Sequence, residues 1–433
     1  MFAEHQYLAI VRSPDAIRWK IYVDRKTQEI KQRSDQIARA QPGSRDIQLL
    51  TQAKEKAEAM LVQDQANLQQ NSGARYAFLE RAIDMYSRCL AASDAFDDDG
   101  AIRLCSLWFA NFQDLPLQDK VRVALERVPS RKFVFLAHQL SARLSASPSG
   151  QTSQNQANLH ALVFRMCREH PFHSLYQVYA LRPERSADGA SSNSRRQSSR
   201  HETSSQADRA AAAIEIFDRL RGDGVSRERV RAVELVCDAS LQWAKHPIKQ
   251  DFQSHQKSSK GPFKIPDGLL IRKIENLRVP IITSQTTLDP TMRYDSCVCI
   301  TRFESTFDVA GGINLPKITI CIGNDGKKYK QLVRIPPLCH TLQLTGLRFK
   351  FKGEGGDDLR QDAVMEQAFG LVNVVLRRDR ETRKRTLGVR HYKVVPLASQ
   401  AGVLEFVGNT MPLRDWLLHA HRRHVTLPCT SKS

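Results

Sequence analysis

The stretch Gly356-Asp357-Asp358-Leu359-Arg360-Gln361-Asp362-Ala363-Val364-Met365 decides the fold of this chain. It stands directly before an amphipathic segment that predicts a helix from Leu359 to about Arg378. Acidic side chains at the start of a helix cap free N–H groups and oppose the positive end of the helix dipole. Helix capping alone does not require this complete string of residues, so the string is a more specific signal than a capping residue.

Short predicted strands lie on both sides of this helix. Upstream, β-branched residues fill four segments, and Asn324-Asp325-Gly326 is a strong hairpin turn between the last two. The upstream strands are expected at 279–283, 296–300, 317–322 and 328–333, and the downstream strands at 390–395 and 402–407. Strands, one major helix and further strands follow each other in the order that a kinase small lobe requires.

The first part of the chain has a different pattern. From Tyr7 to about Leu144, apolar residues recur every three or four positions, as in antiparallel helices. We therefore predict an α+β chain, with an all-α helical-repeat region followed by a kinase-like small lobe and no large lobe. The predicted parts are a helical region (1–181), a disordered Ser/Arg-rich insertion (182–209), the end of the helical region (210–256), the small lobe with its hinge (257–415) and a divergent tail (416–433).

Composition limits the classes of function. No run approaches the roughly 20 apolar residues that a membrane span requires, so a soluble chain with no membrane partner is expected. The nine cysteines have irregular spacing, which predicts reduced thiols and no metal site. The net charge of +19 suits nucleic acid but is spread along the chain, so direct DNA contact is only weakly supported.

The opening stretch closely resembles the G-x-D-D-L-R-Q-D segment of the phosphatidylinositol-kinase-related kinases. The segments 82–90, 101–112 and 128–136 resemble the helical FAT region of the ATM-type members of that family and of their fungal telomere-maintenance counterparts. These helices favour an ATM-type protein kinase over a lipid kinase, which shares the acidic segment and stays an alternative.

The resemblance implies an ion pair beneath the nucleotide phosphates. Asp362 matches the family's helix aspartate, which pairs with a strand lysine that holds the phosphates. Lys352 is the best candidate for this lysine. The chain departs from the family here, because residues 334–351 (RIPPLCHTLQLTGLRFKF) stand where the strand normally runs into Lys-Gly. This atypical insertion is interpreted as translated non-coding sequence, which sequencing of the mature transcript would test.

Two further segments resemble the edges of the family's phosphate-covering loop. They are 303–307 and 310–317, and the hydroxyl and backbone donors of Ser305 and Thr306 are expected to contact phosphate oxygens. Taken alone, Gly311-Gly312 is typical of a simple turn. The interpretation therefore depends on the neighbouring match.

The segments 392–397 and 402–407 resemble the inner strand and the hinge between the lobes. An adenine ring needs a flat apolar slot with one main-chain acceptor and one donor. Glu405 and Val407 are expected to supply the main-chain groups, while Phe406 stacks near the base and Tyr392 lies in the same slot. For Tyr392 and Phe406 the simpler alternative is a buried aromatic residue in a sheet.

The resemblance implies a transferase that uses ATP and Mg²⁺ to phosphorylate Ser or Thr followed by Gln. It implies a nuclear role in double-strand-break signalling and telomere maintenance, with recruitment by a break-sensing complex through regions absent here. No G-D-R-H-x-x-N-like or D-x-G-like segment follows the hinge, so the chain lacks catalytic residues and metal ligands and is predicted to be inactive alone. The other alternative is a non-catalytic helical scaffold or dominant-negative fragment.

Overall fold

The computed structural model describes most of the 433 residues. The described residues are 2–12, 14–39, 45–146, 153–183, 200–246, 262–310, 316–334, 358–398, 401–411, 413, 416–419 and 421. They form two compact units, one from residues 1–136 and 152–162 and the other from residues 137–151 and 163–433. Each unit is described by itself.

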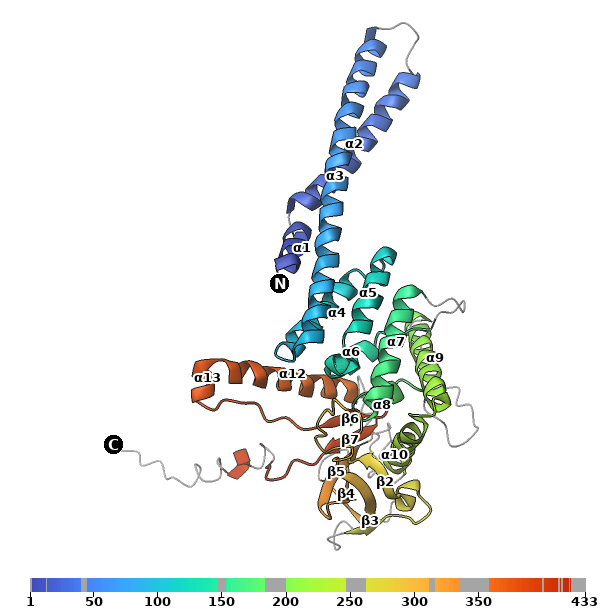
Figure 1. Ribbon diagram of the computed structural model, residues 1–433, viewed down its shortest axis with the longest axis vertical. Helices are drawn as coiled ribbons and strands as arrows, with labels where there is room; N and C mark the ends of the chain where they lie inside the picture. The colour runs from blue at the N-terminus through green and yellow to red at the C-terminus, as the bar shows by residue number, and fades with distance from the viewer. Residues whose placement is uncertain are drawn as a thin grey trace, which may run out of the picture. The chain divides into compact units, whose positions relative to one another are not determined.

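The first unit is entirely helical in its described part. Its central feature is a long antiparallel hairpin of α2 (Pro14–Arg39) and α3 (Arg45–Ala92), which lie side by side in Figure 1. The remaining elements are α1 (Phe2–Arg12), α4 (Asp97–Ala110), α5 (Leu115–Arg127), the 3₁₀ helix η1 (Ser130–Leu136) and the first half of α7 (Gln154–Glu169). The helical pattern predicted from Tyr7 onward is therefore confirmed.

The second unit begins with short helices and then builds a sheet. Its helices are α6 (Ala137–Ser141), the end of α7, α8 (Pro171–Tyr179), α9 (Arg200–Gly222) and α10 (Arg227–Lys245). Helix α9 begins inside the segment 182–209, which was predicted to be disordered; residues 184–199 lie outside the described part. The reason for the earlier start is the apolar, Ala-rich stretch that follows, because Ala212, Ile216 and Phe217 are fully buried and anchor the helix.

The sheet is antiparallel throughout, in the order β1-β3-β4-β5-β7-β6, with β2 also paired to β3. The predicted strands 317–322, 328–333 and 402–407 are confirmed as β4, β5 and β7. The other predicted strands are displaced: β2 ends at Pro280 where 279–283 was predicted, β3 runs from Cys299 to Val309 where 296–300 was predicted, and β6 is shorter and begins later than predicted. Strand β1 was not predicted. Gly326, in the predicted hairpin turn, has a φ of 75°. The strands are β1 (Phe263–Lys264), β2 (Glu275–Pro280), β3 (Cys299–Val309), β4 (Lys317–Gly323), β5 (Lys328–Arg334), β6 (Val394–Pro396) and β7 (Gly402–Glu405).

Helices cover both faces of the sheet. The predicted major helix is α12 (Leu359–Arg378), which is followed by α13 (Arg380–Lys384). Leu332 and Leu404 are directly paired and lie on the face that α12 covers, as Figure 1 shows for the strands β6 and β7. Because side chains alternate along a strand, Thr319, which contacts α10, lies on the opposite face.

None of the described helices combines the length and the apolar character needed to cross a membrane.

Candidate nucleotide site

The start of α12 is held by its own acidic residues. Asp358 is the N-cap, and its Oδ1 accepts a 2.9 Å hydrogen bond from the N–H of Arg360. The Arg360 side chain also donates to both carboxylate oxygens of Asp358, at 2.6 to 3.0 Å. Partial burial acts to raise the pKa of Asp358, but the hydrogen bonds and charge of Arg360 outweigh it and lower that pKa. The capping predicted for the acidic string is confirmed at this residue.

One face of α12 packs on the last two strands of the sheet. Leu359 is 1% exposed and Ala363 is 5% exposed, and both contact a cluster made with Val394 and Leu404. Leu332 and Tyr392 pack against this cluster and remain half-buried. The helix therefore brings the acidic string next to the strand that precedes the hinge.

A single hydrogen bond joins the next turn of α12 to Tyr392. The Glu366 carboxylate accepts a 3.0 Å bond from the main-chain N–H of Tyr392. Asp362 precedes Glu366 by four residues, so it lies one turn earlier on the same side of the helix. Asp362 is half-buried and belongs to the turn that faces this edge of the sheet.

Apolar side chains form a row across the same face of the sheet. Ile320 pairs with Lys330, and the main-chain N–H of Phe406 donates a 3.3 Å bond to the Lys330 carbonyl. Continuing this register to the last strand leads to Tyr392. Ile320, Phe406 and Tyr392 are half-buried, and the Lys330 Nζ lies 5.5 Å from the centre of the Phe406 ring. A flat aromatic ligand needs an apolar face of this kind.

Hydrogen bonds to the backbone hold the predicted hinge in place. The N–H of Glu405 donates to the Lys393 carbonyl at 2.8 Å, and its carboxylate accepts the Lys393 N–H at 3.0 Å. The Val407 carbonyl accepts a 3.2 Å bond from the Thr410 hydroxyl. Glu405, Phe406 and Val407 therefore form an ordered, half-buried segment at the end of β7.

The Lys393 side chain ties the segment before β6 to a loop. Its Nζ donates a 2.9 Å bond to the Ser284 carbonyl. Burial lowers the pKa of Lys393 to about 8, although the nearby Glu405 carboxylate acts in the opposite direction. This lysine is turned toward the loop backbone through that bond.

The predicted phosphate contacts lie on β3, which is next to the edge strand β1. Ser305 and Thr306 both belong to β3, where Ser305 is exposed and Thr306 is half-buried. The Ser305 carbonyl accepts a 2.8 Å bond from Ile265, and Thr306 pairs with Lys264. Their strand is separated from the hinge strand by β4 and β5.

The predicted phosphate lysine, Lys352, lies outside the described residues, together with residues 335–351 of the insertion. Its predicted pairing with Asp362 therefore stays a prediction. Among the residues that the structure describes, no three or more His, Cys, Asp or Glu side chains are grouped so as to hold a metal ion.

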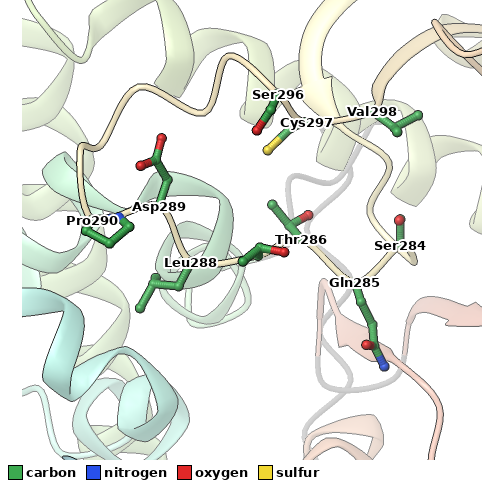
Figure 2. A pocket seen from close by; sticks show the side chains of 10 residues that line it. Ser284, Gln285, Thr286, Leu288, Asp289, Pro290, Ser296, Cys297 and Val298 are labelled. Atoms are coloured by element: carbon green, nitrogen blue, oxygen red, sulfur yellow. The ribbon is translucent and has the colours of Figure 1, made fainter. Parts of the chain in front are cut away.

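A separate cavity lies in the loop between β2 and β3, with a volume of about 330 Å³. Figure 2 shows Ser296 and Cys297 on one side of it and Thr286 on the other. Asp289 also lines it, but its carboxylate already accepts bonds from Thr291 and Tyr294, which lower its pKa to about 2. None of the predicted nucleotide contacts lines this cavity.

Sequence reasoning missed Glu366, Ile320 and Leu332. The alternation along the predicted strands 317–322 and 328–333 would have placed Ile320 on one face, together with Ile318, the partner of Leu332. Glu366 follows Asp362 by one helical turn, and that spacing was the signal for it.

Comparisons with known proteins identify relatives of this chain. Residues 348–432 match the family model described as phosphatidylinositol 3- and 4-kinase, a segment that contains Lys352 and extends into the tail predicted to be divergent. The chain is 33% identical to the serine-protein kinase ATM of Sus scrofa over 96% of its own length. This chain is a homologue of the ATM and Tel1 protein kinases. The homology covers 83% of the chain for the serine/threonine-protein kinase tel1 of Emericella nidulans, at 32% identity.

Solved structures extend the ATM/Tel1 homology to the fold. The structure titled "FAT and kinase domain of CtTel1" matches 98% of the chain with a TM-score of 0.73 and 28% identity. The predicted helical FAT-type region followed by a kinase-type sheet is thereby confirmed. The chain covers 26% of that structure, 13% of the porcine ATM and 12% of the Emericella tel1.

Proposed function

We propose that the second unit binds ATP, with the adenine ring on the apolar row beside the hinge. The row formed by Ile320, Phe406 and Tyr392 carries this proposal, because it lies next to an ordered hinge backbone and to the acid-capped α12. Glu405 and Val407 supply main-chain groups to the base. Tyr392 and Phe406 provide its apolar walls.

The phosphates extend from the base toward β3 and α12. Ser305 and Thr306 offer hydroxyl and backbone donors, and Lys352 neutralises phosphate charge while paired with Asp362. Mg²⁺, when it accompanies ATP, neutralises the charge of the phosphates. Its protein ligands belong to the large lobe of such kinases and not to this chain.

By family resemblance, the activity proposed for this protein is phosphorylation of Ser or Thr followed by Gln. Its relatives are named serine and serine/threonine protein kinases, which supports protein over lipid as the substrate class. The role is in the nucleus, in double-strand-break signalling and telomere maintenance, with recruitment by a break-sensing complex. Loss of Ser-Gln phosphorylation after induced breaks, in cells whose copy of this gene is deleted, tests that role.

The 433-residue chain alone transfers no phosphoryl group, because it contains no segment that orients the attacking hydroxyl or binds magnesium. The purified chain should bind ATP in calorimetry and leave a radiolabelled Ser-Gln peptide assay at background. Transfer above background would contradict the proposed inactivity.

Substitution of an aromatic residue in the proposed adenine slot tests the nucleotide site itself. Tyr392→Ala should weaken ATP and adenosine together by about tenfold, since aromatic contact with a base contributes roughly 1–3 kcal/mol. Tyr22→Ala is the matched control, because Tyr22 lies in α2 and is 41% exposed. If the wild-type chain binds neither ligand, the nucleotide proposal is wrong and a non-catalytic scaffold is favoured.

A further inference from the structure

Lys317 closes the end of a helix rather than facing a ligand. It is the first residue of β4 and is 5% exposed. Its Nζ donates to the carbonyls of Trp243 at 2.6 Å, Ala244 at 3.1 Å and His246 at 2.6 Å. These carbonyls lie at the C-terminal end of α10, where the last carbonyls of a helix have no N–H donors within the helix.

The ring of Trp243 completes this contact. Trp243 is 1% exposed, and the Lys317 Nζ lies 4.2 Å from the centre of its ring. The indole Nε1 donates a 3.0 Å bond to the Thr319 hydroxyl, and the Phe307 ring meets the indole edge-on at 4.8 Å. Three residues of the β3–β4 hairpin, Phe307, Lys317 and Thr319, therefore hold the end of α10.

The geometry excludes Lys317 as the lysine that binds phosphate. An ammonium has three donors, and all three of the recorded bonds go to carbonyls of α10. Lys317 also shares the sheet face of Thr319, whereas Leu332 and Tyr392 pack on the opposite face with α12.

The hairpin end that α10 holds also carries the proposed phosphate contacts. Thr319 pairs with Phe307, the residue that follows Ser305 and Thr306 in β3. Lys317 pairs with Val309, and the Ala310 N–H donates a 2.9 Å bond to the Pro316 carbonyl, so the two strands stay joined at this end. Any movement of β4 away from α10 would displace this part of β3.

We propose that Lys317 is a positioning residue for the phosphate end of the nucleotide site. By capping α10, it couples the last helix of the helical region to the β3–β4 hairpin and fixes Ser305 and Thr306 for the phosphates. This inference rests on the proposed ATP site. It assigns to α10 a direct influence on phosphate binding.

The first test compares two ligands that differ only in their phosphates. Lys317→Met should weaken ATP binding by about tenfold and adenosine binding by less than about twofold, as expected when one buried hydrogen-bonding group is lost. Lys317→Arg, which keeps a charged donor, should recover part of the ATP affinity. Lys327→Met is the matched control, because Lys327 lies in the β4–β5 turn and its side chain is 78% exposed. Equal loss for both ligands would mean that Lys317 only stabilises the fold, and would overturn the proposal.

The second test does not depend on nucleotide. Amide hydrogen exchange in the unliganded chain should become faster at the end of α10 and at the start of β4 in Lys317→Met, while exchange in α12 stays unchanged. Unchanged exchange in all three elements would overturn the coupling even if ATP binds. Failure of the wild-type chain to bind ATP would instead overturn the proposed function, with the exchange result still deciding the coupling. If Lys317→Met does not fold, Thr319→Val removes the Trp243 bond and is judged by the same two measurements.

Discussion

The carboxylate of Glu366 accepts a 3.0 Å hydrogen bond from the main-chain N–H of Tyr392, and this bond joins α12 to the segment directly before β6. Glu366→Ala should lower the free energy of unfolding by about 1 kcal/mol and weaken ATP binding several-fold, because the partly buried N–H of Tyr392 loses its acceptor. Glu366→Gln keeps an acceptor oxygen and should be close to wild type. Urea unfolding and calorimetry with ATP measure both effects, and equal behaviour of the two variants would rule out the role of this bond.

The N-cap of α12 should contribute to stability through its carboxylate. Asp358→Ala removes the acceptor for the Arg360 N–H and should cost about 1 kcal/mol, whereas Asp358→Asn should cost less. The pKa of Asp358 is lowered in the folded chain, so its contribution is present above its ordinary pKa of about 4 and is lost as the pH falls further. Urea titrations between pH 3 and 6 should show a weaker pH dependence for Asp358→Asn than for wild type.

Gly402 is required by close contact between β6, β7 and α12. A Cβ atom at this position would lie 2.5 Å from the Val395 carbonyl oxygen and 3.1 Å from a methyl group of Leu359. Gly402→Ala should therefore destabilise the second unit by roughly 1–3 kcal/mol, since the backbone has to shift. Gly408→Ala is the control, because nothing lies within 4 Å of that position. Thermal unfolding that is equal for the two variants would contradict this packing.

Acid should destabilise the chain through His173. Burial, together with the charge of Lys393 and the neighbouring His170, lowers the pKa of His173 to about 4. Because the folded pKa is below the unfolded value of about 6.5, the unfolded chain binds the proton first and stability falls between pH 6.5 and 4, by roughly 1–2 kcal/mol at pH 5. His173→Gln should reduce this loss in urea unfolding at pH 7 and pH 5.

A comparison with His138 separates the effect of burial from the effect of the Lys393 charge on the pKa of His173. Burial alone lowers the pKa of His138 to about 4. Lys393→Met should therefore raise the pKa of His173 and leave that of His138 unchanged, as followed by the NMR signals of the two imidazoles. Parallel changes at both histidines would mean that Lys393 acts through global stability instead of charge.

Removal of the atypical insertion should strengthen nucleotide binding. Deleting residues 334–351 places Lys352 directly after Val333, as in the kinases that the chain resembles. ATP affinity should rise by at least about tenfold, because a charged lysine then reaches the phosphates. Lys352→Met in the deleted chain should remove the gain. An unchanged affinity after deletion would mean that Lys352 is not the phosphate lysine.

Much of the fold could be predicted because its signals are local. The run from Leu359 to Arg378 is helical with the predicted bounds, and the turn at Gly326 has the positive φ that such a hairpin requires. The start of α9 was missed because the polar stretch before Asp208 carries no apolar pattern of its own. Burial of Ile216 and Phe217 further along the helix supplies the energy that extends it.

The candidate site could be predicted only in part. A resemblance in the short strings around Asp362, Tyr392 and Phe406 was enough to select these residues, because each string is contiguous. The bond from Tyr392 to Glu366 joins positions 26 residues apart, and no local sequence pattern predicts it.

By itself, the sequence determined the helical character of the first part of the chain, the strands β4, β5 and β7, where α12 begins, and the kinase family that the chain resembles, since these depend on neighbouring residues and on contiguous motifs. Only the tertiary structure decided that Lys317 binds the end of α10 while Leu332 and Tyr392 face α12. The physical reason is that the sequence around a lysine at the start of a strand does not indicate which group that lysine will bind. Whether its ammonium meets carbonyls, carboxylates or phosphate depends on which distant element is packed against that face of the sheet.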